Sequence, residues 1–159
     1  MQLAHLLERG GRFEDALAEY RKIRQVYPDS AQATFQTGLV FEKLKRPADA
    51  VTDYRASLDL DPDFVPALNN LAWLLATSKD PKVAAPPEAV GLAMRAANLT
   101  EFKRAPILDT LATAQFAAGQ KESARTTLSQ AIPIARAAGQ AAFATELEAK
   151  LRNYQAAGP

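Results

Sequence analysis

The chain has 159 residues, of which 48% are apolar and 23% are charged, so it can bury the hydrophobic core of a folded domain. Its 19 basic and 18 acidic residues nearly cancel and form no long run of one sign. This balance argues against nucleic acid or an anionic membrane surface as the partner.

Residues 1–30 read as a helical hairpin whose first helix is shortened. Gly10 and Gly11 supply the turn between the two helices. The buried stripe of the second helix comprises Ala16, Tyr20, Ile23 and Tyr27. Five charged residues between Glu8 and Asp15 interrupt any apolar run of signal-peptide or membrane-spanning length. We therefore expect no membrane insertion and a soluble, cytoplasmic protein, with a periplasmic location still open if the chain is a fragment.

Residues 31–64 form a complete helix-turn-helix unit. Small and large residues alternate where two antiparallel helices would pack, and a proline ends the unit: Gly38, Phe41, Ala50, Tyr54 and Pro62. The same pattern occurs 34 residues earlier, at Ala4, Leu7, Ala16, Tyr20 and Pro28, and begins again 34 residues later, at Ala72 and Leu75. A fixed period of this length predicts an all-α solenoid of stacked helical hairpins, not a globular enzyme core.

Residues 65–104 continue the array with a longer internal turn. The first helix is predicted over 65–76, with Asp63 as its N-cap. Ala72 and Ala89 are 17 residues apart, whereas the equivalent Gly38 and Ala50 are 12 apart, so five residues have been added. The insertion falls in 77–87, whose three prolines prevent it from being helical throughout. We expect the second helix over about 88–99.

Residues 105–138 fit the same template, and residues 140–156 form a terminal helix. The template positions of this fourth unit are Leu108, Leu111, Ala112, Gly119, Ala124, Leu128 and Ala131. Pro133 is expected to bend the second helix without ending it. The last segment carries Phe143, Leu147, Leu151 and Tyr154 on one stripe. An amphipathic helix of this kind predicts a cap that covers the apolar face of the last repeat, packed on the second helix of the fourth unit.

These residue types and spacings resemble the tetratricopeptide repeat, over three and a half repeats plus the cap. The usual tryptophan of the family is replaced by Thr34 and Leu68, and the proline that ends a repeat is absent after the third and fourth units. The resemblance implies a scaffold that binds protein partners.

The resemblance also implies which residues face a ligand. In such arrays the first helices of successive repeats line a concave groove. The positions that face it correspond here to Gln32, Phe35, Gln36, Leu39 and Glu42, then Asn69, Asn70 and Trp73, then Asp109, Thr110, Thr113 and Phe116.

The character of these residues favours an extended peptide. Chaperone-binding members hold a peptide carboxylate with Lys and Arg, and this chain has neither at the equivalent positions. Members similar to the superhelix of O-linked N-acetylglucosamine transferase place Asn in one row, which reads Gln36, Asn70 and Thr110 here. Amides and hydroxyls can bond a peptide backbone, and Phe35, Trp73 and Phe116 could be apolar anchors. The alternative is that the two phenylalanines only pack between helices and the asparagines are solvated.

The sequence offers no convincing catalytic or metal-binding set. Asp59, Asp61 and Asp63 have the alternate spacing of a calcium loop. However, Pro62 and Phe64 stand where such a loop needs a ligand-side residue and a glycine for its sharp turn. The single histidine, His5, lacks a second histidine or a cysteine as partner, because cysteine is absent. We therefore expect no cofactor and no metal.

The function that the sequence predicts is non-enzymatic binding of a protein or extended peptide, within a longer protein. A second class remains open, in which the chain is an assembly, oligomerisation or spacer module of a larger enzyme, for example a glycosyltransferase-like protein. The apolar edge of the shortened first helix could then mediate self-association.

Overall fold

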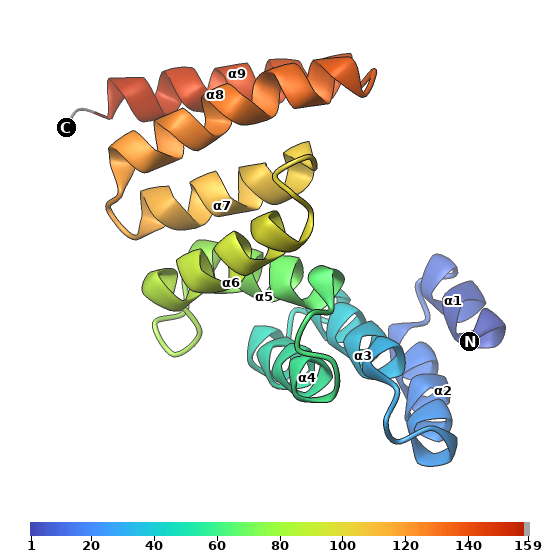
Figure 1. Ribbon diagram of the computed structural model, residues 1–159. Helices are drawn as coiled ribbons and strands as arrows, with labels where there is room; N and C mark the ends of the chain where they lie inside the picture. The colour runs from blue at the N-terminus through green and yellow to red at the C-terminus, as the bar shows by residue number, and fades with distance from the viewer. Residues whose placement is uncertain (158–159) are drawn as a thin grey trace. The chain divides into compact units, whose positions relative to one another are not determined.

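The computed structural model describes residues 1–157, and helices are the only regular secondary structure in this part of the chain (Figure 1). The predicted all-α class is therefore confirmed. The helices are α1 (Gln2–Arg9), α2 (Phe13–Val26), α3 (Ala31–Lys43), α4 (Pro47–Leu60), α5 (Val65–Thr77), α6 (Pro86–Leu99), α7 (Ala105–Ala117), α8 (Lys121–Ala137) and α9 (Ala141–Ala156). Within residues 1–157, no helix has both the length and the apolar character needed to span a membrane.

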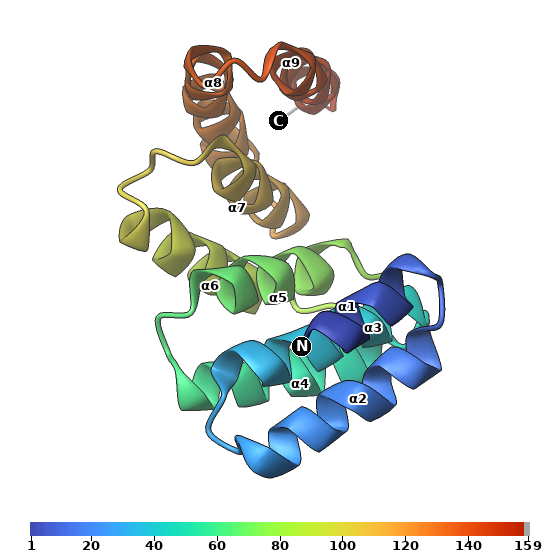
Figure 2. The ribbon, with the colours of Figure 1, turned by 90° about the vertical axis from the view of Figure 1, so that its right-hand side faces the viewer.

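The chain divides into two compact units, and the boundary lies inside α5. Unit 1 is Met1–Asn70, and unit 2 begins at Leu71 and includes all later residues. In unit 1 the contacts run from α1 to α2, from α2 to α3 and from α3 to α4, which is the order of a stacked array (Figure 2). In unit 2 they run from α6 to α7, from α7 to α8 and from α8 to α9.

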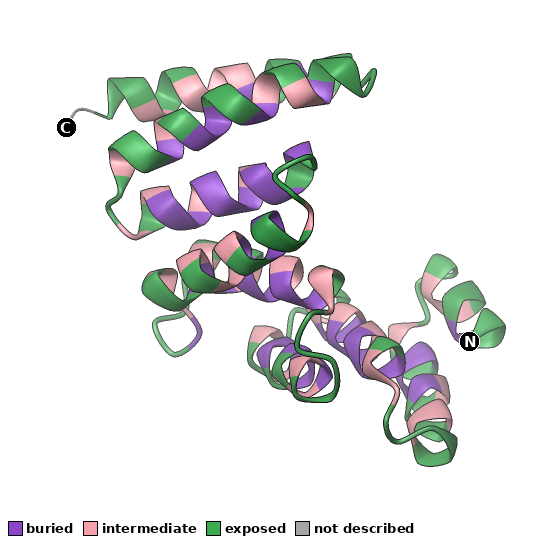
Figure 3. Cartoon of the chain, viewed as in Figure 1, coloured by how far each residue is buried: buried purple, intermediate pink, exposed green. Residues whose placement is uncertain are grey.

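The small and large positions read from the sequence meet inside unit 1. Gly38 of α3 lies under the ring of Tyr54 of α4, and a Cβ atom at Gly38 would be 2.6 Å from Tyr54 Cε1. Tyr54 is fully buried, so the two helices can approach this closely only because residue 38 has no side chain. Buried positions fall on the helix faces that meet in this way (Figure 3).

The start of α5 at Val65 agrees with the sequence prediction, whereas its predicted N-cap and the start of α6 do not. Ser30 caps α3, because its Oγ accepts a hydrogen bond from the Ala33 N–H at 3.1 Å. Helix α5 begins at Val65, so Phe64 and not Asp63 precedes its first residue. Helix α6 begins at Pro86, two residues earlier than predicted. Both prolines fit its first turn, where a backbone N–H has no partner within the helix.

The inserted segment between α5 and α6 is a short turn with one buried anchor. The Ala85 N–H donates to the Leu75 carbonyl at 3.0 Å, and the Val83 N–H donates to the Asp80 carbonyl at 2.9 Å. The Val83 side chain is 5% exposed. These contacts attach the inserted residues to the end of α5.

The C-terminal helices follow the sequence prediction. Helix α8 continues through Pro133 to Ala137, and the predicted final helix is present as α9. It lies beside α8 (Figure 1) and buries Ala144 and Leu147. Helicity of this segment and its packing on α8 are both confirmed.

Candidate functional site

The candidate residues fall in both units, and each unit presents its own set. In unit 1, Gln32 of α3 is exposed, and Gln36 and Leu39 are half-buried. Phe35 is 6% exposed and packs against Tyr54 and Phe64, with ring centroids 5.5 and 5.4 Å apart. Phe35 is therefore part of the unit 1 core and offers little surface to a ligand.

The two asparagines of α5 are held by a polar network of unit 1. The Asn69 Nδ2 donates to Asn70 Oδ1 at 3.4 Å, and the Asn70 amide hydrogen-bonds the Tyr54 hydroxyl. The Tyr54 hydroxyl in turn donates to Glu42 Oε1. Burial raises the pKa of Tyr54, Glu42 raises it further, and the Asn70 amide opposes this shift. Asn70 is thus oriented by a neighbour instead of being loosely solvated.

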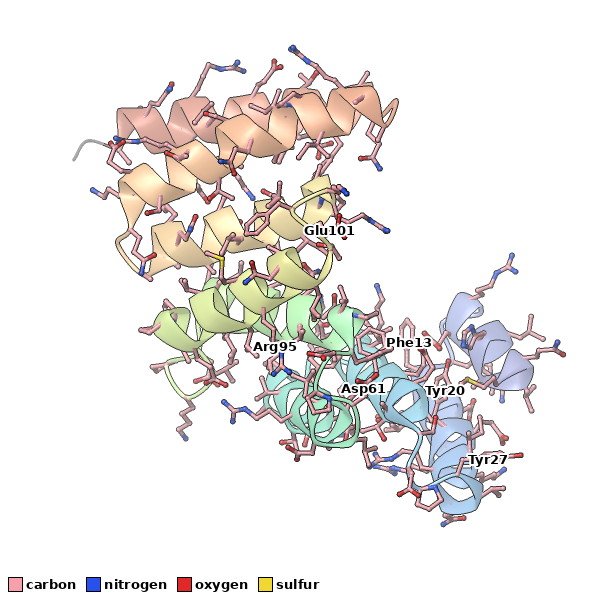
Figure 4. All side chains as sticks on the ribbon, in the orientation of Figure 1. Phe13, Tyr20, Tyr27, Asp61, Arg95 and Glu101 are labelled. Atoms are coloured by element: carbon pink, nitrogen blue, oxygen red, sulfur yellow. The ribbon has the colours of Figure 1, made fainter. Side chains whose placement is uncertain are left out.

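The same tyrosine–glutamate pair occurs one repeat earlier. The Tyr20 hydroxyl of α2 (Figure 4) donates to Glu8 Oε1 of α1 at 2.5 Å. Tyr20 and Glu8 stand 34 residues before Tyr54 and Glu42. Burial, followed by Glu8, raises the pKa of Tyr20. The repeat therefore preserves a polar contact as well as the packing positions, and the sequence analysis missed it.

In unit 2 the candidate residues of α7 contact α9. The Lys150 ammonium lies 2.6 Å from Asp109 Oδ1 and 2.9 Å from Thr113 Oγ1. The Phe116 ring stacks on Tyr154 with centroids 3.7 Å apart and planes 10° apart. Thr110 is 3% exposed, and its hydroxyl donates to the Pro106 carbonyl of its own helix. Much of the predicted ligand-facing surface of α7 is thus covered by side chains of the last helix.

Trp73 is the most exposed aromatic side chain among the candidates. Trp73 is 39% exposed, and the Lys150 Nζ lies 5.2 Å from the centroid of its ring. Burial raises the pKa of the neighbouring Tyr154, while a hydrogen bond with Thr113 opposes the shift and the Asp109 charge adds to it. Trp73, Asp109, Thr113, Lys150 and Tyr154 form one connected group that combines an open aromatic face with ionic contacts.

Lys150 and Tyr154 are the residues that sequence reasoning missed. The sequence predicts Tyr154 only as part of the apolar stripe of a cap, and Lys150 is not among the predicted site residues. Their spacing of four residues places both on one face of a helix, which was the available signal. A cap that covers only α8 would not need Lys150, whose four-carbon stem instead reaches α7.

The outer face of α1 and α2 exposes apolar side chains. Met1, Leu3 and Leu6 are 48%, 54% and 64% exposed, and Val26 and Tyr27 (Figure 4) are 68% and 64% exposed. A hollow of about 210 Å³ lies on the same side, lined by Met1, Leu3, Ala4, Glu19, Lys22, Ile23, Val26 and Tyr27. We call this surface the N-terminal apolar face.

The family is shown by direct comparison. The model of the tetratricopeptide repeat family matches residues 1–63 and 46–98. The chain therefore belongs to the tetratricopeptide repeat family, as its spacings indicated. The comparison with curated proteins finds no match.

Solved structures of the same fold come from several proteins. MamA from Desulfovibrio magneticus RS-1, residues 41 to the end, is 16% identical, with 98% of this chain and 93% of that chain covered and a TM-score of 0.74. PilF from Pseudomonas aeruginosa is 22% identical, with 96% and 70% covered and a TM-score of 0.74. The first repeat domain of Spaghetti (RPAP3), bound to the HSP90 peptide SRMEEVD, is 17% identical, with 80% and 92% covered and a TM-score of 0.67. At these identities the likeness establishes the fold.

Proposed function

We propose that this chain is a non-enzymatic scaffold that binds a protein or an extended peptide through the first helices of its repeats. Its family generally provides interaction scaffolds, and one structural neighbour is bound to a peptide. We assign the repeats to 1–30, 31–64, 65–104 and 105–138, with 140–156 as the cap. In this assignment α3, α5 and α7 are the first helices that carry the ligand-facing positions, and α9 covers much of this surface on α7.

The observation that carries this proposal is the exposure of Trp73. A tryptophan buries 150–250 Å² when it is fully covered, so a partner that covers the 39% of Trp73 now exposed would gain apolar contact area. Trp is also enriched among the residues that dominate binding energy. Trp73 lies on α5 near the polar side chains of Asp109 and Thr113, which supply the hydrogen-bonding groups that an extended peptide needs.

The amide side chains of unit 1 support the same proposal. Asn70 is held by the Tyr54 hydroxyl, and Gln36 is half-buried. A held amide loses less side-chain entropy when it bonds a peptide backbone, which favours binding. Phe35 is buried and is therefore excluded from the proposed ligand-binding surface. The remaining ligand-facing residues of unit 1 are Gln32, Gln36, Leu39, Asn69 and Asn70.

A peptide-display selection tests the proposed function. Wild-type protein should enrich sequences that Trp73→Ala fails to retain, because the variant lacks the aromatic anchor. Gln130→Ala is the control, since Gln130 is an exposed residue of α8. A selection that enriches nothing, or that enriches the same peptides on both Trp73→Ala and wild type, would contradict binding at this surface.

The N-terminal apolar face favours a second function, which is assembly. Five large apolar side chains on one end of unit 1 are more than a monomer usually leaves in water. Sedimentation velocity over a hundredfold range of protein concentration separates the two proposals. A groove binder should remain monomeric, whereas an assembly module should associate, and Leu3→Gln with Leu6→Gln should reverse that association.

A further inference from the structure

Three groups from two helices converge on the ammonium of Lys150. Asp109 and Thr113 of α7 approach its Nζ at 2.6 and 2.9 Å, and the Trp73 ring of α5 lies 5.2 Å away. The Asp109 and Lys150 side chains are only 14% and 26% exposed. The three residues that contact the ammonium all belong to α5 and α7. These two helices therefore form the site, and α9 supplies the lysine that fills it.

Two of the three receiving groups favour a cation over a neutral group, and the third accepts a hydrogen bond from it. A carboxylate and a hydroxyl oxygen accept hydrogen bonds from an ammonium, which has three donors and no acceptor. The face of a tryptophan ring attracts a positive charge through its quadrupole. A poorly exposed carboxylate also becomes unfavourable when its counter-ion is removed, so this site should be filled by one cation or another.

We propose that Trp73, Asp109 and Thr113 form a binding site for a protonated amine, and that a partner peptide places a lysine side chain there. Lys150 occupies the site in the protein alone and gives way when the partner binds. This inference rests on the proposed peptide-binding function and adds the chemistry of the ligand.

Exchange of the two lysines does not require α9 to leave. Lys150 is attached through a flexible four-carbon stem, so its ammonium can move to solvent by side-chain rotation alone. The last turn of α9 is held separately, because Arg125 donates to the Tyr154 carbonyl from Nε at 3.1 Å and from Nη2 at 2.9 Å. The helix also keeps its apolar contacts with α8 through Leu147. A partner would therefore compete with one side chain and keep the surface around it.

Trp73 makes this proposal directly measurable, because it is the only tryptophan in the chain. The experiment titrates n-butylammonium chloride into the full-length Lys150→Ala variant and follows Trp73 emission and the melting temperature. We expect saturable binding and a rise in melting temperature. Butylammonium should bind the wild type roughly tenfold more weakly, because the tethered Lys150 competes for the site. Sodium chloride at equal ionic strength and n-butanol are the salt and neutral controls, and both should give no saturable change.

A second substitution identifies the acceptor. Asp109→Asn in the Lys150→Ala background should weaken butylammonium binding by roughly tenfold or more, since it removes a charged hydrogen-bond acceptor. If Lys150→Ala does not fold, Lys150→Met keeps the side-chain stem, and methylammonium becomes the probe. A folded variant that shows no saturable response, or a response that Asp109→Asn leaves unchanged, would overturn the amine site.

The peptide selection separates this inference from the function on which it rests. Lysine enrichment among peptides that depend on Trp73 would support the inference. Peptides that depend on Trp73 but carry no basic residue would overturn it and leave peptide binding intact. If the selection finds no peptide while butylammonium binds as expected, the amine site is supported and the peptide-binding function fails.

Discussion

Removal of α9 should unfold or aggregate unit 2, although α9 is the last helix of the chain. Leu147 is 1% exposed, and its burial contributes about 2 kcal/mol. The methyl group of Ala144 adds about 0.8 kcal/mol, and the half-buried side chains of Phe143, Leu151 and Tyr154 add about 1 kcal/mol each. The loss of about 6 kcal/mol is comparable with the whole stability of many domains, which is about 5–15 kcal/mol.

Urea denaturation followed by circular dichroism, together with size-exclusion chromatography, tests this estimate. A chain ending at Gly139 should show a lost or much weakened transition and should self-associate. The point variant Leu147→Ala should lose about 3 kcal/mol, which lowers the urea midpoint by about 1.5 M at an m-value near 2 kcal/mol/M. Glu146→Ala, on the exposed side of α9, should change stability by less than about 0.5 kcal/mol. A truncated chain that is monomeric and keeps the wild-type midpoint would refute the reasoning.

Three further predictions follow from the packing and the polar contacts. Gly38→Leu should destabilise the protein by about 3 kcal/mol or more because of the Tyr54 ring, whereas Gly91→Ala, in an open helical position, should stabilise it by about 0.5–1 kcal/mol; equal urea midpoints would contradict this packing. Because the pKa of Tyr54 is raised in the folded state, the folded protein favours the neutral hydroxyl, and the free energy of unfolding should fall as the pH rises above about 10. This loss of stability should be smaller in Tyr54→Phe. Identical stability profiles against pH for the two proteins would count against the buried hydroxyl. Trypsin should cut first at Lys79 or Lys82 in the inserted turn, and Val83→Ser should accelerate that cut; a first cut inside α3 or α4 would show that the turn is not the least stable segment.

The helices could be predicted from the sequence because the same pattern of small and large residues recurs in successive repeats. The packing of Gly38 against Tyr54 can be predicted from the sizes of the two residues. The 34-residue period can be read directly from the sequence, because residues of the same sizes recur at that spacing. Helix starts were less predictable, because two consecutive prolines can stand either before a helix or in its first turn, and α6 uses the latter arrangement. The fold was thus predictable in its elements and less so at their ends.

The candidate site was predictable only in part, because the predicted positions came from first helices alone. Trp73 is exposed as a binding residue should be, but Phe35 is drawn into the core by Tyr54 and Phe64. The periodicity of the sequence predicts on which face of a helix a residue lies. Whether that residue is buried depends on the aromatic side chains that pack against it. The contact of Lys150 with Asp109 joins residues 41 positions apart, outside the 34-residue period, so no repeat pattern could reveal it.

The central claim is that the protein binds a peptide through α5, and one paired measurement tests it most directly. Calorimetric titration with a selected peptide and urea denaturation would be performed on wild type, Trp73→Ala, Asn70→Ala and Ala72→Arg. We predict that Trp73→Ala and Asn70→Ala each weaken binding by about 1 kcal/mol or more, which is at least roughly fivefold, and that both variants remain folded. Asn70→Ala should lose about 1 kcal/mol of stability through its contact with Tyr54. Ala72→Arg, at a fully buried position, should unfold the protein. A strongly destabilised Trp73→Ala with no separate loss of binding would contradict the account and identify Trp73 as a core residue.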